Sequence, residues 1–165
     1  MPSFISKVKK KLKSGAWYPF YNTFYEKVPV DKKEILLVSR SGLALESNIL
    51  AILKELNQPE YKEFYKVLAV QKNKKEQIQK KLERYGISVD KFVYTREPSY
   101  YYHLAKAGWL INDTTFPGRY IKKDGQTYLN VWHGTPLKRM GQDNPEERYD
   151  TGNVMRNLLQ SDRKS

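Results

Sequence analysis

The sequence contains no cysteine, only two histidines and no long apolar run. Without cysteine, a disulfide-stapled secreted fold, a cysteine nucleophile and a cysteine-ligated zinc site are excluded. Two histidines on their own also argue against a zinc site, which needs three or four ligands. No stretch approaches the roughly 20 apolar residues that span a bilayer. The N-terminal region lacks the continuous apolar core and the small-residue cleavage site of a signal peptide.

Acidic residues are few compared with basic ones. The chain has 165 residues, enough for one domain with a real core, and carries 30 Lys and Arg against 18 Asp and Glu, a formal net charge of +12. This balance favours an anionic partner, such as nucleic acid, an acidic membrane surface or a phosphorylated substrate. No recognisable nucleic-acid-binding motif accompanies the charge, so we expect no nucleic-acid partner.

The first 28 residues read as a segment of their own. A helix at residues 3–13 would place Phe4, Ile5, Val8 and Leu12 on one face. Its other positions carry Lys7, Lys9, Lys10, Lys11 and Lys13. A basic amphipathic helix is typical of membrane-surface segments. An aromatic cluster follows, with Trp17, Tyr18, Phe20, Tyr21, Phe24 and Tyr25, and such rings can lie at the headgroup level.

We therefore expect residues 1–28 to associate with an anionic membrane through Phe4, the five lysines and Trp17. The alternative is that this segment docks on the domain with its lysines in solvent. Residues 29–165 are then expected to form a single α/β domain.

Short apolar runs alternate with helical patterns along residues 29–165. The expected strands cover residues 34–39, 65–71, 92–94, 109–113 and 128–132. The expected helices cover residues 43–56, 74–85 and 99–106, with one more at 153–160. This alternation predicts right-handed crossovers and a Rossmann-like parallel sheet with flanking helices. A further strand is expected after the last helix and none follows, which suggests that the chain is a fragment.

The sharpest functional candidate is His133, which follows the fifth expected strand directly. In open parallel sheets, ligands bind beyond the carboxyl ends of the strands. Gly134 permits close backbone approach, and Thr135 is a favourable N-cap for a helix whose free amides would attract an anion. Lys138 and Arg139 add positive charge for a phosphate. An imidazole with a pKa near 6.5 suits a general base, and the alternative is a histidine hydrogen-bonded at a strand end.

Several other residues could assist at this edge. Asp113 and Asp143 could each orient the imidazole from behind, although each could equally cap a loop. Arg40, Ser41 and Asn48 could contact a ligand, with a simple capping role open for Ser41. His103 is read as structural, because it lies in an aromatic helix without a polar cluster.

The stretch 128–141, Tyr-Leu-Asn-Val-Trp-His-Gly-Thr-Pro-Leu-Lys-Arg-Met-Gly, resembles the signature of the CDP-glycerol glycerophosphotransferase family, which contains teichoic acid primases and polymerases of Gram-positive bacteria. Residues 111–114 and 152–157 also look like this family. The resemblance implies the N-terminal, acceptor-side half of a GT-B-like fold. Its C-terminal donor-binding domain, which holds the residues that grip the nucleotide, would be absent from these 165 residues.

The resemblance further implies transfer of glycerol phosphate or ribitol phosphate. The donor would be CDP-glycerol or CDP-ribitol, with no separate cofactor, and the acceptor a lipid-linked polyol phosphate or polymer. The enzyme would lie peripherally on the cytoplasmic face of the cell membrane, and the family's catalytic histidine corresponds to His133. We expect no turnover from this chain alone. Two alternatives stay open: a GT-B glycosyltransferase that uses a nucleotide sugar, and a non-catalytic membrane- or acceptor-binding module.

Overall fold

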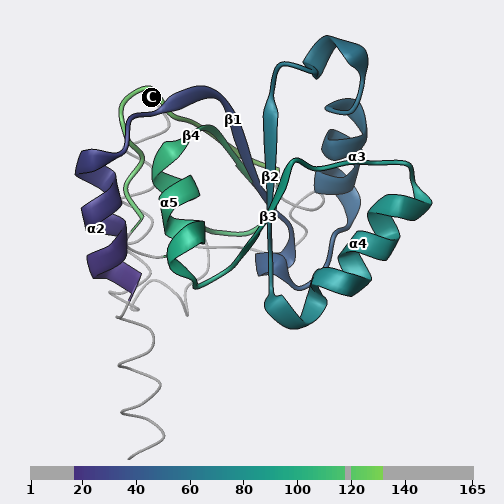
Figure 1. The fold of residues 1–165 in the computed structure, drawn as a ribbon, viewed down its shortest axis with the longest axis horizontal. Coiled ribbons are helices and arrows are strands. Elements are labelled where there is room, and N and C mark those ends of the chain that lie inside the picture. Colours follow the sequence, from purple (N-terminus) through teal and green to yellow (C-terminus); the bar gives the residue numbers. More distant parts are fainter. Residues whose placement is uncertain (1–16, 118–119, 132–165) are drawn as a thin grey trace, which may run out of the picture.

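The computed structural model describes residues 17–117 and 120–131. These residues form a five-stranded sheet in the order β3-β2-β1-β4-β5, and all neighbouring strands pair in parallel (Figure 1). The strands are β1 (Asp31–Val38), β2 (Tyr65–Val70), β3 (Lys91–Tyr94), β4 (Ala107–Asn112) and β5 (Thr127–Asn130). The predicted Rossmann-like α/β architecture is confirmed.

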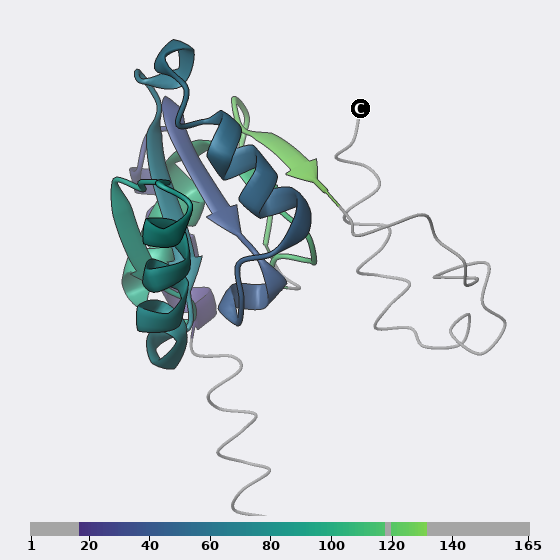
Figure 2. The same cartoon turned by 90° about the vertical axis from the view of Figure 1, so that its right-hand side faces the viewer.

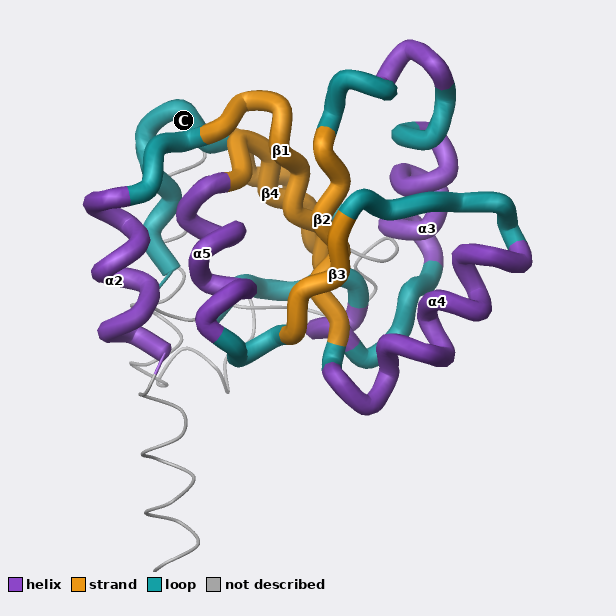
Figure 3. The backbone as a smooth tube through the Cα atoms, viewed as in Figure 1, coloured by secondary structure: helices purple, strands orange, loops and turns teal. Residues whose placement is uncertain are grey.

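Four helices and three short 3-10 turns accompany these strands within the described residues, and α2 precedes β1 whereas the others lie between strands (Figure 3). The helices are α2 (Trp17–Lys27), α3 (Ser47–Glu55), α4 (Lys75–Arg84) and α5 (Pro98–Lys106). The 3-10 turns are η1 (Arg40–Gly42), η2 (Pro59–Tyr61) and η3 (Lys72–Lys74). None of the described helices combines the length and the apolar character needed to cross a membrane.

Helices cover both faces of the sheet, which explains the continuous apolar run in β1. Ile35 and Leu37 face a cluster with Ile49 and Leu53 of α3 and with residues of α4. Leu36 and Val38 point to the opposite face, where residues of α2 and α5 cover them. Every strand residue from Ile35 to Val38 is therefore buried.

Element boundaries differ from the predicted ones by two or more residues in four places, one of which is β4, which begins at Ala107 rather than residue 109. β1 begins at Asp31 rather than residue 34, because its pairing with β4 extends to Ala107 although residues 32 and 33 are exposed. α3 begins at Ser47 rather than residue 43, because the turn after β1 occupies the intervening chain. β5 ends at Asn130, two residues earlier than predicted.

Helix α2 packs on the domain. Tyr21 is only 1% exposed, and its hydroxyl donates to Ile121 O at 2.5 Å. The Phe24 ring meets Tyr102 of α5 edge-on, with centroids 5.6 Å apart. The expectation that the aromatic cluster lies at a membrane surface is therefore wrong for Tyr21, since the domain core already buries this ring. The boundary predicted at residue 28 therefore separates, in the sequence, a helix from the domain against which that helix packs.

Candidate functional site

The candidate site lies at the edge where the five parallel strands have their carboxyl ends. β1 has β2 on one side and β4 on the other, so the order of the strands reverses at β1. Ligands of open α/β sheets bind in the crevice outside such a reversal point. Val38 at the end of β1 lies opposite Asn112 at the end of β4. Figure 2 shows β5, in light green, at one margin of the sheet.

Asp113 joins the ends of β1 and β4. Its Oδ2 accepts a hydrogen bond from Ser39 Oγ at 2.9 Å, and its Oδ1 accepts one from Arg40 N at 2.7 Å. The residue is 3% exposed, so both bonds lie away from bulk solvent. Asp113 thus lies at the predicted edge and caps the turn after β1, as in the loop-capping interpretation. Sequence reasoning missed Ser39, because a serine after a strand has many possible partners.

The turn after β1 holds three successive residues with left-handed backbone. The φ angles are 48° at Arg40, 55° at Ser41 and 80° at Gly42. A Cβ at Gly42 would lie 2.8 Å from Thr95 Cγ2 and 2.9 Å from Gln71 N, so only glycine fits here. For the other two residues this conformation costs about 1–3 kcal/mol each, and such strain clusters at functional sites.

The strained turn carries polar groups that can contact a ligand. Ser41 Oγ is exposed and lies 3.4 Å from Thr114 Oγ1, which follows β4. The Arg40 side chain is 50% exposed, with Glu46 as a distant partner at 3.9 Å. Hydroxyl groups and a guanidinium at this edge of the sheet suit a phosphate or a polyol. The predicted contact candidates Arg40 and Ser41 therefore lie together at the reversal point.

Polar contacts also hold the end of β5. Val131 N donates to Asn112 O at 2.8 Å, and Val131 O accepts from Asn48 Nδ2 at 3.1 Å. Asn130 Nδ2 donates to Thr114 O at 2.9 Å. The Tyr128 hydroxyl lies 3.1 Å from the Asn112 amide, and burial raises the pKa of this tyrosine, which keeps it neutral.

The buried Asn112 amide ties the same region together. With the amide oriented so that its NH₂ group faces Thr114 O, the orientation that satisfies both of its ends, it donates to Thr114 O at 3.1 Å and accepts from Phe116 N at 3.2 Å. The segment after β4 is thus fastened to β4 itself, and through Thr114 to β5. The ends of both strands are therefore set relative to each other by side-chain amides.

His133 lies two residues beyond Val131 and outside the described residues. The remaining predicted site residues outside the described part are Gly134, Thr135, Lys138, Arg139 and Asp143. The predicted membrane contacts Phe4, Lys7, Lys9, Lys10, Lys11 and Lys13 also lie outside it, and Trp17 begins α2.

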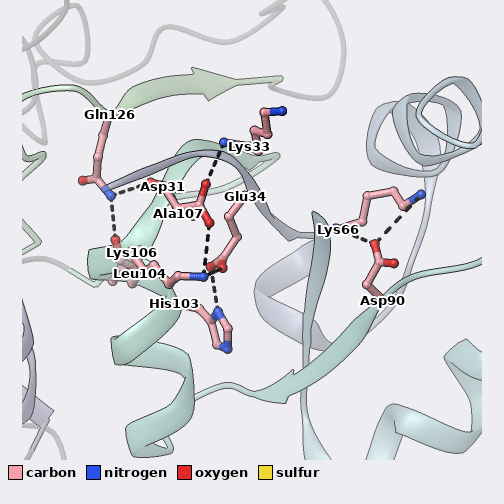
Figure 4. A network of polar contacts seen from close by, with 10 residues as sticks. All are labelled: Asp31, Lys33, Glu34, Lys66, Asp90, His103, Leu104, Lys106, Ala107 and Gln126. Carbon is pink, nitrogen blue, oxygen red and sulfur yellow. Dashed lines mark hydrogen bonds and ion pairs between the residues drawn. The ribbon is translucent and has the colours of Figure 1, made fainter. Parts of the chain in front are cut away.

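His103 lies in a buried polar network (Figure 4). Its Nδ1 lies 2.7 Å from Glu34 Oε1, and Glu34 Oε2 accepts from Lys106 Nζ at 2.6 Å. Lys106 also pairs with Asp31 at 3.3 Å. The hydrogen bond with Glu34 is the main cause that raises the pKa of Lys106 above its usual value.

The structural interpretation of His103 fits this geometry, whereas the expectation that it lacks a polar cluster is wrong. Glu34 belongs to β1, 69 residues earlier, and no local pattern pairs the two. The network also lies near the amino end of β1, away from the turn that Asp113 holds. Among the described residues, no group of three or more histidine, aspartate and glutamate side chains could hold a metal ion.

A family model described as CDP-Glycerol:Poly(glycerophosphate) glycerophosphotransferase matches residues 20–165 of the chain. The chain belongs to this family. The glycerophosphotransferase match begins inside α2, so the family pattern includes the helix that packs on the domain. It also includes β5 and the His-Gly-Thr-Pro sequence that follows it. The predicted family resemblance is confirmed.

Two curated glycerophosphotransferase relatives are similar to this chain. The teichoic acid poly(glycerol phosphate) polymerase of Bacillus subtilis (strain 168) is 28% identical over 149 residues, which is 86% of this chain and 19% of that protein. The polymerase of the same description from Staphylococcus epidermidis is 41% identical over 44 residues, 27% of this chain and 6% of that protein. The chain thus spans about a fifth of the length of the Bacillus polymerase.

Solved structures of the wall teichoic acid polymerase TagF share the fold. One, soaked with CDPG, has a TM-score of 0.64 at 22% identity and covers 85% of this chain and 32% of its own. Another has a TM-score of 0.61 at 17% identity and covers 94% of this chain and 40% of its own. The five-stranded sheet is therefore the Rossmann-like part of a GT-B-like fold, as predicted.

Proposed function

We propose that this chain forms the acceptor side of the active site of a glycerophosphotransferase in cell-wall polymer synthesis. The reaction would transfer glycerol phosphate, or ribitol phosphate, from a CDP-linked donor to a lipid-linked or polymeric acceptor. One observation carries the proposal: the family's signature sequence follows directly on β5, whose end is hydrogen-bonded to the end of β4 and to Asn48 of α3, the helix that follows the strand-order reversal at β1. This is where an α/β sheet of this kind presents its ligands.

In the proposed reaction, His133 is the general base. The acceptor hydroxyl oxygen attacks the phosphorus of the glycerol phosphate, the bond from that phosphorus to CMP breaks, and CMP leaves. The proton of the hydroxyl passes to the imidazole, whose pKa near 6.5 suits this step at neutral pH. Phosphoryl transfer depends mainly on positioning and on stabilisation of negative charge.

The residues after His133 would supply that stabilisation. Gly134 and Thr135 would shape the start of a helix whose free amides favour an anion, and Lys138 and Arg139 would add two positive charges. Asp143 would orient the imidazole from behind, whereas Asp113 holds the turn that carries Arg40 and Ser41. On the described side of the crevice, Arg40 and Ser41 would contact the acceptor.

The test is the rate of glycerophosphate transfer by the full-length protein. We expect His133→Ala to lower kcat by about 10²–10⁴-fold, the usual contribution of a general base. The midpoint of thermal unfolding should stay unchanged and serves as the control for folding. Unchanged turnover in this variant would refute the assignment of the base.

Donor choice separates the reaction from its rivals. CDP-glycerol or CDP-ribitol should support transfer, whereas nucleotide sugars should not. Transfer from a nucleotide sugar alone would instead establish a glycosyltransferase. Acceptor binding without transfer from any donor would indicate a non-catalytic module.

The proposal also includes a membrane partner. The lysines of residues 7–13 would hold the protein peripherally on the anionic cytoplasmic face of the cell membrane, close to a lipid-linked acceptor. Each lysine near such a surface contributes about 1 kcal/mol. The formal net charge of +12 supports this part of the proposal.

A further inference from the structure

The side chain of Asn48 connects the start of α3 to the end of β5. Its Nδ2 donates to Val131 O at 3.1 Å, across 83 residues of sequence. We propose that Asn48 is a positioning residue, which sets the direction in which the chain leaves β5 toward His133. This inference rests on the proposed function, because it assumes that His133 is the base.

One peptide unit joins Val131 to Trp132. A peptide unit is planar, so the direction of its carbonyl fixes the plane that runs from one Cα to the next. Asn48 holds this carbonyl, and Asn112 O holds the amide of the same residue at 2.8 Å. Val131 is therefore held at both its N–H and its C=O, and His133 follows it by two residues in the sequence.

The start of α3, which carries Asn48, is held by hydrogen bonds of its own. Glu46 N, just before α3, donates to Ser39 Oγ at 3.3 Å, and Ser39 Oγ donates to Asp113 at 2.9 Å. The start of α3 is therefore tied to the turn after β1 and to the end of β4. Through Asn48 the same contacts reach β5, so one hydrogen-bonded series links three strand ends.

The N-terminus of α3 lacks a side-chain cap. Ser47 there has a left-handed φ of 46°. An asparagine in the first turn of a helix commonly bonds its own backbone. Here the Asn48 amide reaches β5, the strand on the far side of β4 from β1. A positioning role requires such a bond between distant parts of the chain.

The first test compares the steady-state kinetics of Asn48→Leu with those of the unaltered full-length protein. Leucine has nearly the same shape as asparagine and carries no charge. The substitution therefore removes the amide donor without adding an electrostatic field at His133. Misplacing a catalytic group by about 1 Å costs on the order of 100-fold in rate. We expect kcat to fall about 10–100-fold, with the KM for the CDP-linked donor within about 2-fold. Asn48→Gln, which keeps the amide donor, should retain more turnover than Asn48→Leu.

A double-mutant cycle with His133→Ala provides a readout that a merely structural role would not move. If Asn48 acts through His133, Asn48→Leu should change the residual kcat of His133→Ala by less than about 2-fold, because effects of residues that act as a unit are non-additive. Equal losses in both backgrounds would overturn the inference, as would an Asn48→Leu variant with unchanged kcat. Full activity of His133→Ala would refute the proposed function itself, and this inference with it.

Asn57 provides the matched control at the other end of the same helix. Its Nδ2 also donates to backbone carbonyls, Leu53 O at 2.8 Å and Ser88 O at 3.1 Å. Asn57→Leu should lower the midpoint of thermal unfolding. It should change kcat by the same small factor in the protein with His133 and in the His133→Ala variant. A selective kcat loss in Asn57→Leu equal to that of Asn48→Leu would contradict a specific role for Asn48.

Discussion

At the scale of single residues, Glu34 shows how a charge is accommodated inside this domain. Its side chain is fully buried, and each carboxylate oxygen has a partner, His103 on one side and Lys106 on the other. Removing one member of such a buried set leaves the others unpaired in a medium of low dielectric constant. The residue therefore matters for folding although it lies away from the candidate site.

We expect Glu34→Gln to lower the free energy of unfolding by about 3 kcal/mol, as for other broken buried pairs. The new amide would direct its NH₂ group at a cation or at an imidazole N–H. Urea denaturation at neutral pH measures the change.

The control is Glu63→Gln, which breaks an exposed ion pair with Lys33 at 2.9 Å. We expect no measurable change there, because solvent and salt screen exposed pairs. An equal loss of unfolding free energy in Glu34→Gln and Glu63→Gln would contradict the conclusion that burial makes the Glu34 contacts the stronger ones.

At the scale of elements, α2 is held by contacts that are distant in sequence. Tyr21 contacts the chain 100 residues later through its hydroxyl, and its ring lies 5.8 Å from that of Tyr120. Lys123 Nζ donates to Val28 O just after the helix, and burial lowers the pKa of this lysine. Helix α2 thus packs against both α5 and the segment before β5.

Tyr21→Ala should therefore destabilise the domain by about 3–5 kcal/mol, as expected for truncation of a large buried aromatic ring. Thermal or urea unfolding checks this value. Tyr85→Ala, which truncates a tyrosine that is 51% exposed, should cost far less. A negligible effect of Tyr21→Ala would mean that α2 is free to leave the domain.

At the scale of the whole molecule, all five lysines of the proposed membrane contact precede α2 in the sequence. The lysines at positions 7–13 precede Trp17, where α2 begins, and α2 is committed to the domain through Tyr21. A deletion that removes α2 would expose core residues of α5, so it would confuse anchoring with folding. Substitution of the lysines avoids this difficulty.

We expect a variant with all five N-terminal lysines changed to glutamine to lose binding to vesicles of anionic lipid in a flotation assay. The substitutions are Lys7→Gln, Lys9→Gln, Lys10→Gln, Lys11→Gln and Lys13→Gln. If each lysine contributes about 1 kcal/mol, the partition coefficient falls by more than 10²-fold.

The control changes the net charge equally at five exposed lysines elsewhere: Lys54, Lys62, Lys72, Lys80 and Lys91. Binding should then fall much less, because these lysines are spread over the domain surface. Equal loss in both variants would show a general charge effect without an anchor.

The sequence by itself determined the class of fold and the family. Continuous apolar runs such as residues 34–38 alternate with helical patterns, and that periodicity predicts a buried parallel sheet before any contact is known. The Trp-His-Gly-Thr-Pro sequence marks the family because such a motif is local in the chain.

Only the tertiary structure decided which side chains meet. Glu34 and His103 lie 69 residues apart, and Asn48 and Val131 lie 83 residues apart. The order of strands brings each pair together, and a local pattern carries no information on that order. The docking of α2 through Tyr21 depends on the same long-range closure. Periodicity therefore specifies the elements, whereas packing over long sequence separations specifies the partners of Asp113, Asn48 and His103.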